Sequence, residues 1–144
     1  MHASQPVDPE CIFCRIVSGT IPCHRLYEDE DVLGFLDVGP VSRGHALIIP
    51  KGHWATLDQV PADVAAAAMR VAPRLSRAIM NATGAEAWNV LQNNGKLAHQ
   101  AVDHVHFHII PRTSDAGLEI GWPSGSLGDE DAAALVAAIA RGMN

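Results

Sequence analysis

The segment from His104 to Ile110 constrains the fold of this chain more than any other. Histidine and apolar residues alternate in it, so a β-strand would place His104, His106 and His108 on one face and the apolar side chains against a core. Buried imidazoles need hydrogen bonds, a ligand or water, unless they form the solvent-facing side of the strand. One metal bound by all three rings is poor geometry, because the rings span ~13 Å and ligand bonds are about 2 Å long. Different roles for the three rings fit the pattern better.

Length, composition and charge indicate one globular domain. The 144 residues are 48% hydrophobic and 18% charged, which is enough apolar material for a single buried core. The formal net charge of −6 disfavours nucleic acid or an anionic membrane as a partner. The first residues lack the features of a signal peptide, and no apolar run approaches the ~20 residues of a membrane span. We therefore expect a cytoplasmic protein that binds neither nucleic acid nor membrane.

The three cysteines, Cys11, Cys14 and Cys23, do not form a disulfide framework, because their number is odd and the expected compartment is reducing. The Cys11-x-x-Cys14 spacing suits a redox pair, one half of a zinc site, or two buried thiols. The spacing alone leaves these alternatives open. Cys23 is most simply a small apolar residue.

Hydrophobic periodicity and turn residues predict an α+β fold with an antiparallel sheet. Residues 1–10 are expected to be a disordered tail, and residues 11–144 a single domain that ends in a loop and helix over 113–144. The longest helix is predicted over 61–81, with a kink or break at Pro73. The predicted strands cover 25–28, 32–36, 45–49, 88–91 and 102–111. The predicted short helices cover 11–18 and 129–140.

Several motifs together resemble one known family. The His104–Ile110 run resembles the histidine triad (HIT) signature, and the resemblance continues at Asp37 and over residues 44–53 and 93–100. Within that family the chain is similar to the Hint branch of nucleoside phosphoramidate hydrolases, and residues 121–123, Gly-Trp-Pro, resemble a fungal-type member. The resemblance implies a five-stranded antiparallel sheet with one long helix and short terminal helices. It also implies a homodimer in which two such sheets join into one.

The resemblance further implies covalent catalysis by the middle histidine. His106 would attack the α-phosphorus of an adenine nucleotide as a neutral imidazole, with its other nitrogen held by a backbone carbonyl. His108 would donate to the phosphate oxygens and stabilise the transition state. His45 would orient the catalytic imidazole, or else be a structural histidine satisfied by backbone groups. Gln100 would lie near the phosphate and the leaving group.

Other positions match residues that bind the nucleotide in the family. Asp37 would accept from the ribose hydroxyls, Val38 would lie against the base, and Asn93 would contact the nucleotide. Many relatives carry Gly-Gln-Ser or Gly-Gln-Thr where this chain has His99, Gln100 and Ala101. Losing that hydroxyl should cost about 1 kcal/mol, and His99 either narrows the leaving-group side or supplies a new donor. The implied nucleotide-binding residues are Asp37, Val38, Asn93, His99, Gln100, Ala101, His106 and His108.

Bacterial relatives suggest the other half of the metal site. They pair an N-terminal Cys-x-x-Cys with two histidines around zinc, and the matching residues are Cys11, Cys14, His53 and His104. Two thiolates and two imidazoles make a closed tetrahedral set, so the resemblance implies a structural zinc ion. It would fasten the N-terminal helix to the catalytic strand.

The predicted function is hydrolysis of purine nucleoside phosphoramidates, similar to an adenosine 5′-monophosphoramidase, on an AMP-type substrate. The intermediate would be nucleotidylated His106. Three alternatives remain at this point: a diadenosine polyphosphate hydrolase, a nucleotide-binding interaction module with incidental turnover, and a redox protein that uses Cys11 and Cys14.

Overall fold

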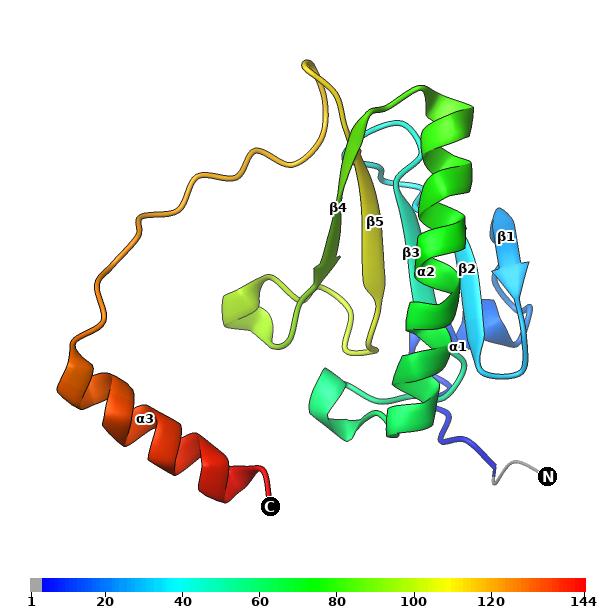
Figure 1. Cartoon of the computed structure of the whole chain (residues 1–144). Coiled ribbons are helices and arrows are strands. Elements are labelled where there is room, and N and C mark those ends of the chain that lie inside the picture. The colour runs from blue at the N-terminus through cyan, green and yellow to red at the C-terminus, as the bar shows by residue number, and fades with distance from the viewer. Residues whose placement is uncertain (1–3) are drawn as a thin grey trace.

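A five-stranded antiparallel sheet forms the centre of the protein, with the strand order β1-β2-β3-β5-β4 (Figure 1). The structure is a computed structural model, and it describes residues 4–144; residues 1–3 of the expected tail lie outside the described part. The α+β prediction with five antiparallel strands is confirmed. The strands are β1 (Arg25–Glu28), β2 (Val32–Leu36), β3 (Ala46–Pro50), β4 (Ala87–Gln92) and β5 (Phe107–Arg112).

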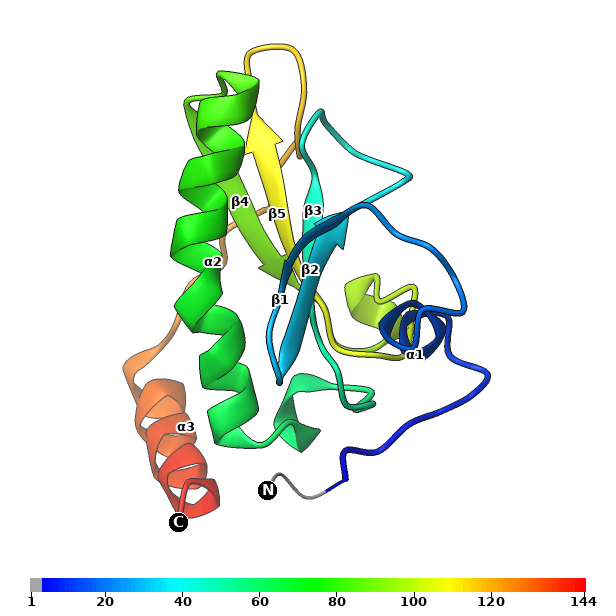
Figure 2. The same ribbon diagram turned by 90° about the vertical axis from the view of Figure 1, so that its right-hand side faces the viewer.

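One helix covers each face of the sheet, as Figure 2 shows. The long helix α2 (Ala62–Thr83) lies on one face, and the short helix α1 (Ile12–Val17) lies on the other. Two 3₁₀ helices, Leu57–Gln59 and Lys96–Ala98, lie in the connections. The last helix, α3 (Asp129–Gly142), follows the irregular segment 113–128. None of the helices in residues 4–144 has the length and apolar character of a membrane span.

The central strands are apolar on both sides because both faces of the sheet are covered. Val32 and Ile48 belong to the core under α2, whereas Leu33 and Ile49 belong to the core under α1. Their alternation follows the period of two that a strand imposes. The β2 and β3 segments therefore appear in the sequence as continuous apolar runs.

Helix α2 runs unbroken through Pro73, so, of the kink or break predicted there, the break is wrong. A proline inside a helix leaves the carbonyl four residues earlier without its donor, and here Pro73 and Met69 are both exposed to water, which can replace it. The helix ends at Gly84, which adopts the left-handed backbone with φ 76° that glycine accommodates without strain.

Strand β5 begins later than predicted, at Phe107 rather than at residue 102. The N–H of Val105 donates to the carbonyl of Trp54 (2.8 Å), and Nδ1 of His106 donates to the carbonyl of His104 (2.7 Å). These bonds hold the segment outside the sheet ladder. Two of the three triad histidines therefore precede the strand, and His108 lies within it.

Candidate active site and metal centre

A cleft of about 310 Å³ opens on the α1 face of the sheet. His106 and His108 line it together with Asp37 and Val38 from the end of β2, and apolar side chains of α1 complete the wall. A larger cavity of about 460 Å³ lies beside α2, but its lining holds Arg43 and no histidine, cysteine or carboxylate. The cleft is thus the better candidate for chemistry, although it is the smaller of the two.

His106 has one nitrogen committed to the backbone and the other left for chemistry. Its ring is 5% exposed, and Nδ1 lies 2.7 Å from the carbonyl oxygen of His104. A carbonyl only accepts hydrogen bonds, so Nδ1 carries the proton and Nε2 keeps its lone pair. The Phe13 ring packs edge-on against the imidazole at 5.1 Å between centroids and fixes its plane. This is the tautomer that a nucleophile on Nε2 requires.

A chain of hydrogen bonds places the proton of His108 on Nε2, whereas His106 carries its proton on Nδ1. The N–H of Val41 donates to Nδ1 of His45 (3.0 Å), so the proton of His45 resides on Nε2. That Nε2–H donates to Nδ1 of His108 (2.9 Å), which leaves His108 with its proton on Nε2. His45 is 3% exposed, and its ring contacts His108. Its predicted role in orienting the catalytic imidazole stays a prediction.

Burial keeps this pair of imidazoles neutral. Burial is the largest cause that lowers the pKa of His108 to about 4; the neighbouring His106 and His45 add to this effect, and Asp37 opposes it. Burial also lowers the pKa of His45, against the opposing effect of Asp37, whose Oδ2 lies 3.6 Å from Nε2. Near neutral pH the chain of donors described above therefore consists of neutral rings.

We expect His108 to make the protein less stable in acid. Because its pKa falls from 6.5 to about 4 on folding, the unfolded chain binds the proton first, and stability present above pH 6.5 is lost as pH falls toward 4. The loss from this group should be about 1–2 kcal/mol, since its partly exposed ring is screened by solvent. Urea unfolding at pH 7.0, 5.5 and 4.5 should show a shallower acid loss in His108→Gln than in wild type. Parallel pH dependences in the two proteins would contradict the prediction.

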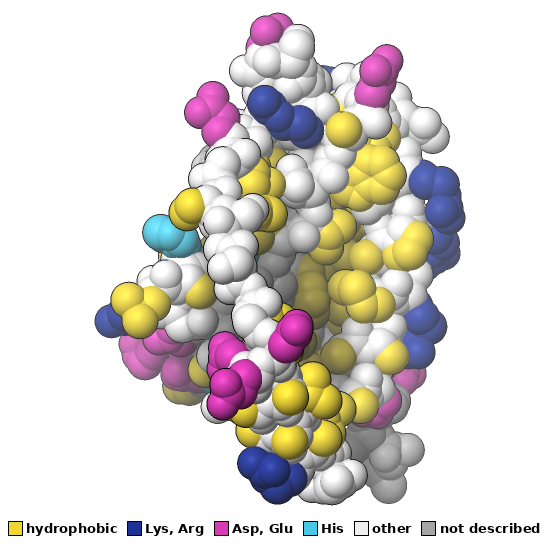
Figure 3. Space-filling model, turned by 60° about the vertical axis from the view of Figure 1, so that its left-hand side comes forward, with side chains coloured by type: hydrophobic (Ala, Val, Ile, Leu, Met, Phe, Trp, Pro, Cys, Tyr) yellow, Lys and Arg dark blue, Asp and Glu magenta, His cyan; other side chains and the backbone are white. Residues whose placement is uncertain are grey.

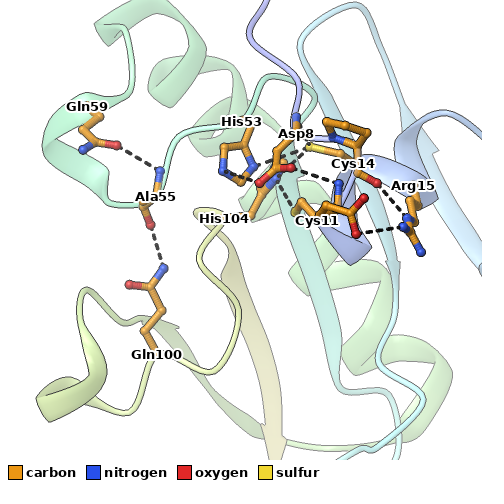
Figure 4. A network of polar contacts seen from close by, with 11 residues as sticks. Asp8, Cys11, Cys14, Arg15, His53, Ala55, Gln59, Gln100 and His104 are labelled. Carbon is orange, nitrogen blue, oxygen red and sulfur yellow. Dashed lines mark hydrogen bonds and ion pairs between the residues drawn. The ribbon is translucent and has the colours of Figure 1, made fainter.

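Four side chains form a second cluster beside the cleft (Figure 4). The ligand atoms of Cys11, Cys14, His53 and His104 all lie within 4.8 Å of one another. Nδ1 of His104 is 3.5 Å from the Cys11 sulfur and 3.6 Å from the Cys14 sulfur, and Nδ1 of His53 is 3.5 Å from Cys14. A tetrahedral zinc ion, with bonds of about 2.3 Å to sulfur and 2.0 Å to nitrogen, separates such atoms by about 3.5 Å. The donor set fits zinc.

The outer nitrogens of both histidines in this cluster face acceptors. Nε2 of His104 donates to the carbonyl of Pro50 (2.8 Å), so Nδ1 presents a lone pair to the two sulfurs. Nε2 of His53 lies 3.9 Å from a carboxylate oxygen of Asp8. Burial raises the pKa of the Cys14 thiol, so a bare thiolate is unfavourable there and a bound cation would stabilise it. The cluster therefore has the chemistry of a metal centre.

The metal cluster and the nucleophile share one residue. His104 contributes its ring to the cluster and its carbonyl to Nδ1 of His106. Phe13, which lies between Cys11 and Cys14 in the sequence, packs edge-on against both His104 (5.7 Å) and His106 (5.1 Å). The sequence motifs did not predict this contact, for which the position of Phe13 between the two cysteines is the available signal.

Comparison with known proteins supplies the family. Residues 18–115 match the HIT domain family. The chain belongs to the HIT family. Among its relatives, adenosine 5′-monophosphoramidase hnt1 of Schizosaccharomyces pombe is 48% identical over 87% of this chain and 92% of its own length. Adenylylsulfatase HINT3 of Arabidopsis thaliana is 43% identical over 96% of this chain and 72% of its own length.

Solved HIT structures share the fold over nearly the whole chain. A hypothetical protein from Leishmania major superimposes with a TM-score of 0.87 at 42% identity, covering 93% of this chain and 96% of that one. A zinc-bound histidine triad family protein from Mycobacterium smegmatis gives a TM-score of 0.70 at 39% identity, covering 92% and 94%.

The HIT domain brings some of the predicted nucleotide-binding residues to the cleft and leaves others away from its wall. Asp37, Val38, Ala101, His106 and His108 line it. Residues 93, 99 and 100 do not belong to its lining in the described structure.

Gln100 has a positioning role in this structure. It is 6% exposed, and its Nε2 donates to the carbonyls of Ala55 (2.6 Å) and Val102 (3.0 Å), while Oε1 accepts from the N–H of Gly95 (2.7 Å). Figure 4 shows the bond to Ala55 across the loop. These bonds join three backbone segments beside the cleft, which explains why a glutamine suits the position.

His99 and Asn93 lie near that loop. His99 is exposed and has a left-handed backbone with φ 66°, a conformation that glycine adopts without strain. Asn93 is half-buried at the end of β4, and its carbonyl accepts from the side chain of Gln92.

Proposed function

We propose that this HIT protein hydrolyses purine nucleoside phosphoramidates of the adenosine 5′-monophosphoramidase type, through a covalent intermediate on His106. The observation that carries the proposal is a pair of imidazoles in one cleft whose hydrogen bonds set complementary tautomers. His106 presents a lone pair on Nε2, and His108 presents a proton on Nε2. The relatives named as adenosine 5′-monophosphoramidases and as an adenylylsulfatase support this choice, because both names describe substrates that contain an adenylyl group.

The reaction would proceed in two displacements. Nε2 of His106 attacks the α-phosphorus, the bond from phosphorus to the leaving nitrogen breaks, and the leaving amine takes up a proton from solvent. The Nε2–H of His108 donates to a phosphate oxygen and stabilises the charge that develops there. Water then attacks the phosphorus and loses a proton to solvent, the bond to Nε2 breaks, and AMP and neutral His106 are released.

The two ends of the cleft suit the two parts of a nucleoside. The side chain of Asp37, an acceptor in its ionised form, stands at the end of β2 on the cleft wall and is partly exposed to solvent. Apolar residues of α1, among them Ile12 and Ile16, provide an apolar wall for a purine.

Trapping the intermediate tests the proposal. Wild-type protein quenched during turnover of adenosine 5′-phosphoramidate should carry one nucleotidyl group, detected by intact-mass spectrometry and localised by peptide mapping to His106. Alkaline quench conditions preserve phosphohistidine-type bonds and should retain the adduct. An adduct on another residue, or turnover with no adduct under single-turnover conditions, would overturn the covalent mechanism.

Asp37→Asn should lower kcat/KM by about 10-fold, because a charge-assisted hydrogen bond to the ribose becomes a neutral one. Asparagine retains an acceptor for the N–H of Gly39, which now donates to Asp37 (2.8 Å), so the local turn should persist. A 2′-deoxy substrate gives the control: wild type should discriminate against it, and the variant should discriminate less. Unchanged discrimination would remove Asp37 from the ribose site.

We also propose a structural zinc ion held by Cys11, Cys14, His53 and His104. The ligand separations described above and the zinc-bound mycobacterial neighbour support it. When bound, zinc would supply a fixed link between α1 and the segment before β5. No catalytic step is assigned to the ion.

We propose a homodimer in which β4 is the joining strand. It is one of the two edge strands of the sheet, and its side chains Trp88 and Val90 are 44% and 49% exposed. Pairing of two β4 strands would cover this edge. A reducing, cytoplasmic location agrees with the free cysteines, and the charge of −6 agrees with a small nucleotide rather than nucleic acid or membrane as the partner.

A further inference from the structure

Helix α3 has an apolar face that nothing else in residues 4–144 buries. Leu135, Val136, Ile139 and Met143 recur at helical spacing along one side, and they are 46%, 69%, 62% and 80% exposed. No residue of this helix is buried within the described chain. A helix of 14 residues is marginal on its own in water, so α3 needs a surface to pack on.

An apolar groove of matching length lies along α2, on the side that faces β1 and β2. Two adjoining cavities, of about 460 and 170 Å³, share Leu26, Leu75 and Ala78 in their linings. Together they follow α2 from Val71 to Thr83, about 18 Å at 1.5 Å per residue. The apolar face of α3, over residues 132–143, is about 17 Å long by the same measure. The groove can therefore accept the whole face.

The charges of the two surfaces are complementary. Arg43 and Arg74 line the groove, which contains no carboxylate. The first turn of α3 carries three consecutive acids, at residues 129–131. In a chain with a net charge of −6, a groove lined by arginine alone among the charged residues favours an acidic amphipathic helix.

The position of α3 indicates that the groove it fills belongs to a second copy. Figure 1 shows α3 beyond β4, whereas the groove is on the opposite side of α2. Figure 3 shows hydrophobic side chains along the hollow between the C-terminal segment and the body of the protein. A copy joined at β4 would lie in this hollow and present the far side of its own α2 to α3.

We propose that α3 of each copy docks into the α2 groove of the other copy. Two-fold symmetry makes the exchange reciprocal, so each dimer contains two such contacts. The inference rests on the proposed dimer but fails separately from it, because a dimer joined at β4 alone would leave α3 exposed. It is independent of the reaction proposed for the cleft.

Complementation between two variants tests the exchange. Ile139→Asp places a charge on the apolar face of α3, and Ala78→Asp places one in the groove; both positions are exposed, so each protomer should fold. Each variant alone should raise the Kd of its homodimer by 10-fold or more. A mixed dimer keeps one wild-type helix in one wild-type groove. Native mass spectrometry of the mixture, with one variant mass-labelled, should therefore find heterodimers well above half of all dimers.

Ala137→Asp is the matched control, because it adds the same charge on the opposite face of α3. We expect it to dimerise like wild type. Heterodimers at the random proportion of half, or an unchanged Kd for Ile139→Asp, would overturn the exchange while leaving a dimer at β4 intact. A monomeric wild type with a protease-protected α3 would show that the helix docks on its own chain, and this would overturn both proposals.

Discussion

His106→Asn should lower kcat for adenosine 5′-phosphoramidate by on the order of 10³- to 10⁶-fold, which is the range seen when a covalent nucleophile is removed. Asparagine has no ring nitrogen to attack phosphorus. Its amide can still donate to the carbonyl of His104, where Nδ1 of His106 now donates at 2.7 Å, so the segment before β5 should keep its course. Steady-state release of AMP from the two proteins measures the effect.

Two controls separate loss of chemistry from loss of structure. The melting temperature of the variant and its Kd for AMP should stay close to the wild-type values, because the substitution fills most of the same space. His108→Gln should reduce kcat less than His106→Asn, since it removes a stabilising donor and not the attacking atom. Equal slow rates in wild type and His106→Asn would favour the alternative in which this HIT protein is a nucleotide-binding module with incidental turnover.

The strands could be predicted from local signals, and the metal cluster could be predicted from the resemblance to a family. The segments 32–36 and 45–49 are apolar runs bounded by turn residues, and they form β2 and β3 within one residue of the expected limits. The pairing of Cys11 and Cys14 with His53 and His104 came from resemblance alone, and the structure brings these four side chains together.

The remaining features depend on contacts between distant segments. The resemblance places Gln100 near the phosphate and the leaving group, but it does not predict that Gln100 donates to the carbonyl of Ala55, 45 residues earlier in the chain. The late start of β5 depends on a bond from Val105 to Trp54, which no local pattern encodes. Helix α3 was expected from its own composition, but its distance from the body of the protein was not, because amphipathicity does not say which surface a helix covers.

Cys14→Ser should remove bound zinc and lower the melting temperature by about 10 °C or more, because loss of a structural metal removes several kcal/mol of folding free energy. Metal content of protein purified without chelator should fall from about one zinc per chain to near none. Cys23→Ser is the matched control: Cys23 is half-buried and lies outside the cluster, so this variant should keep both its metal and its stability.

Loss of the zinc ion should also alter the active site, because the backbone of His104 connects the metal cluster to His106. The ring of His104 belongs to the metal cluster, and the carbonyl of His104 accepts from Nδ1 of His106. The ring of Phe13 packs against both histidines. Without the metal, the segment before β5 should let the His106 imidazole adopt other orientations. The ¹⁵N resonances of its ring should therefore broaden or move in Cys14→Ser and in chelator-treated wild type. The kcat of both samples should fall as well. A wild type that is metal-free, fully folded and unaffected by chelator would overturn the zinc proposal and leave Cys11 and Cys14 as two buried thiols. If zinc leaves and the His106 resonances do not change, the ion stabilises α1 without ordering the nucleophile.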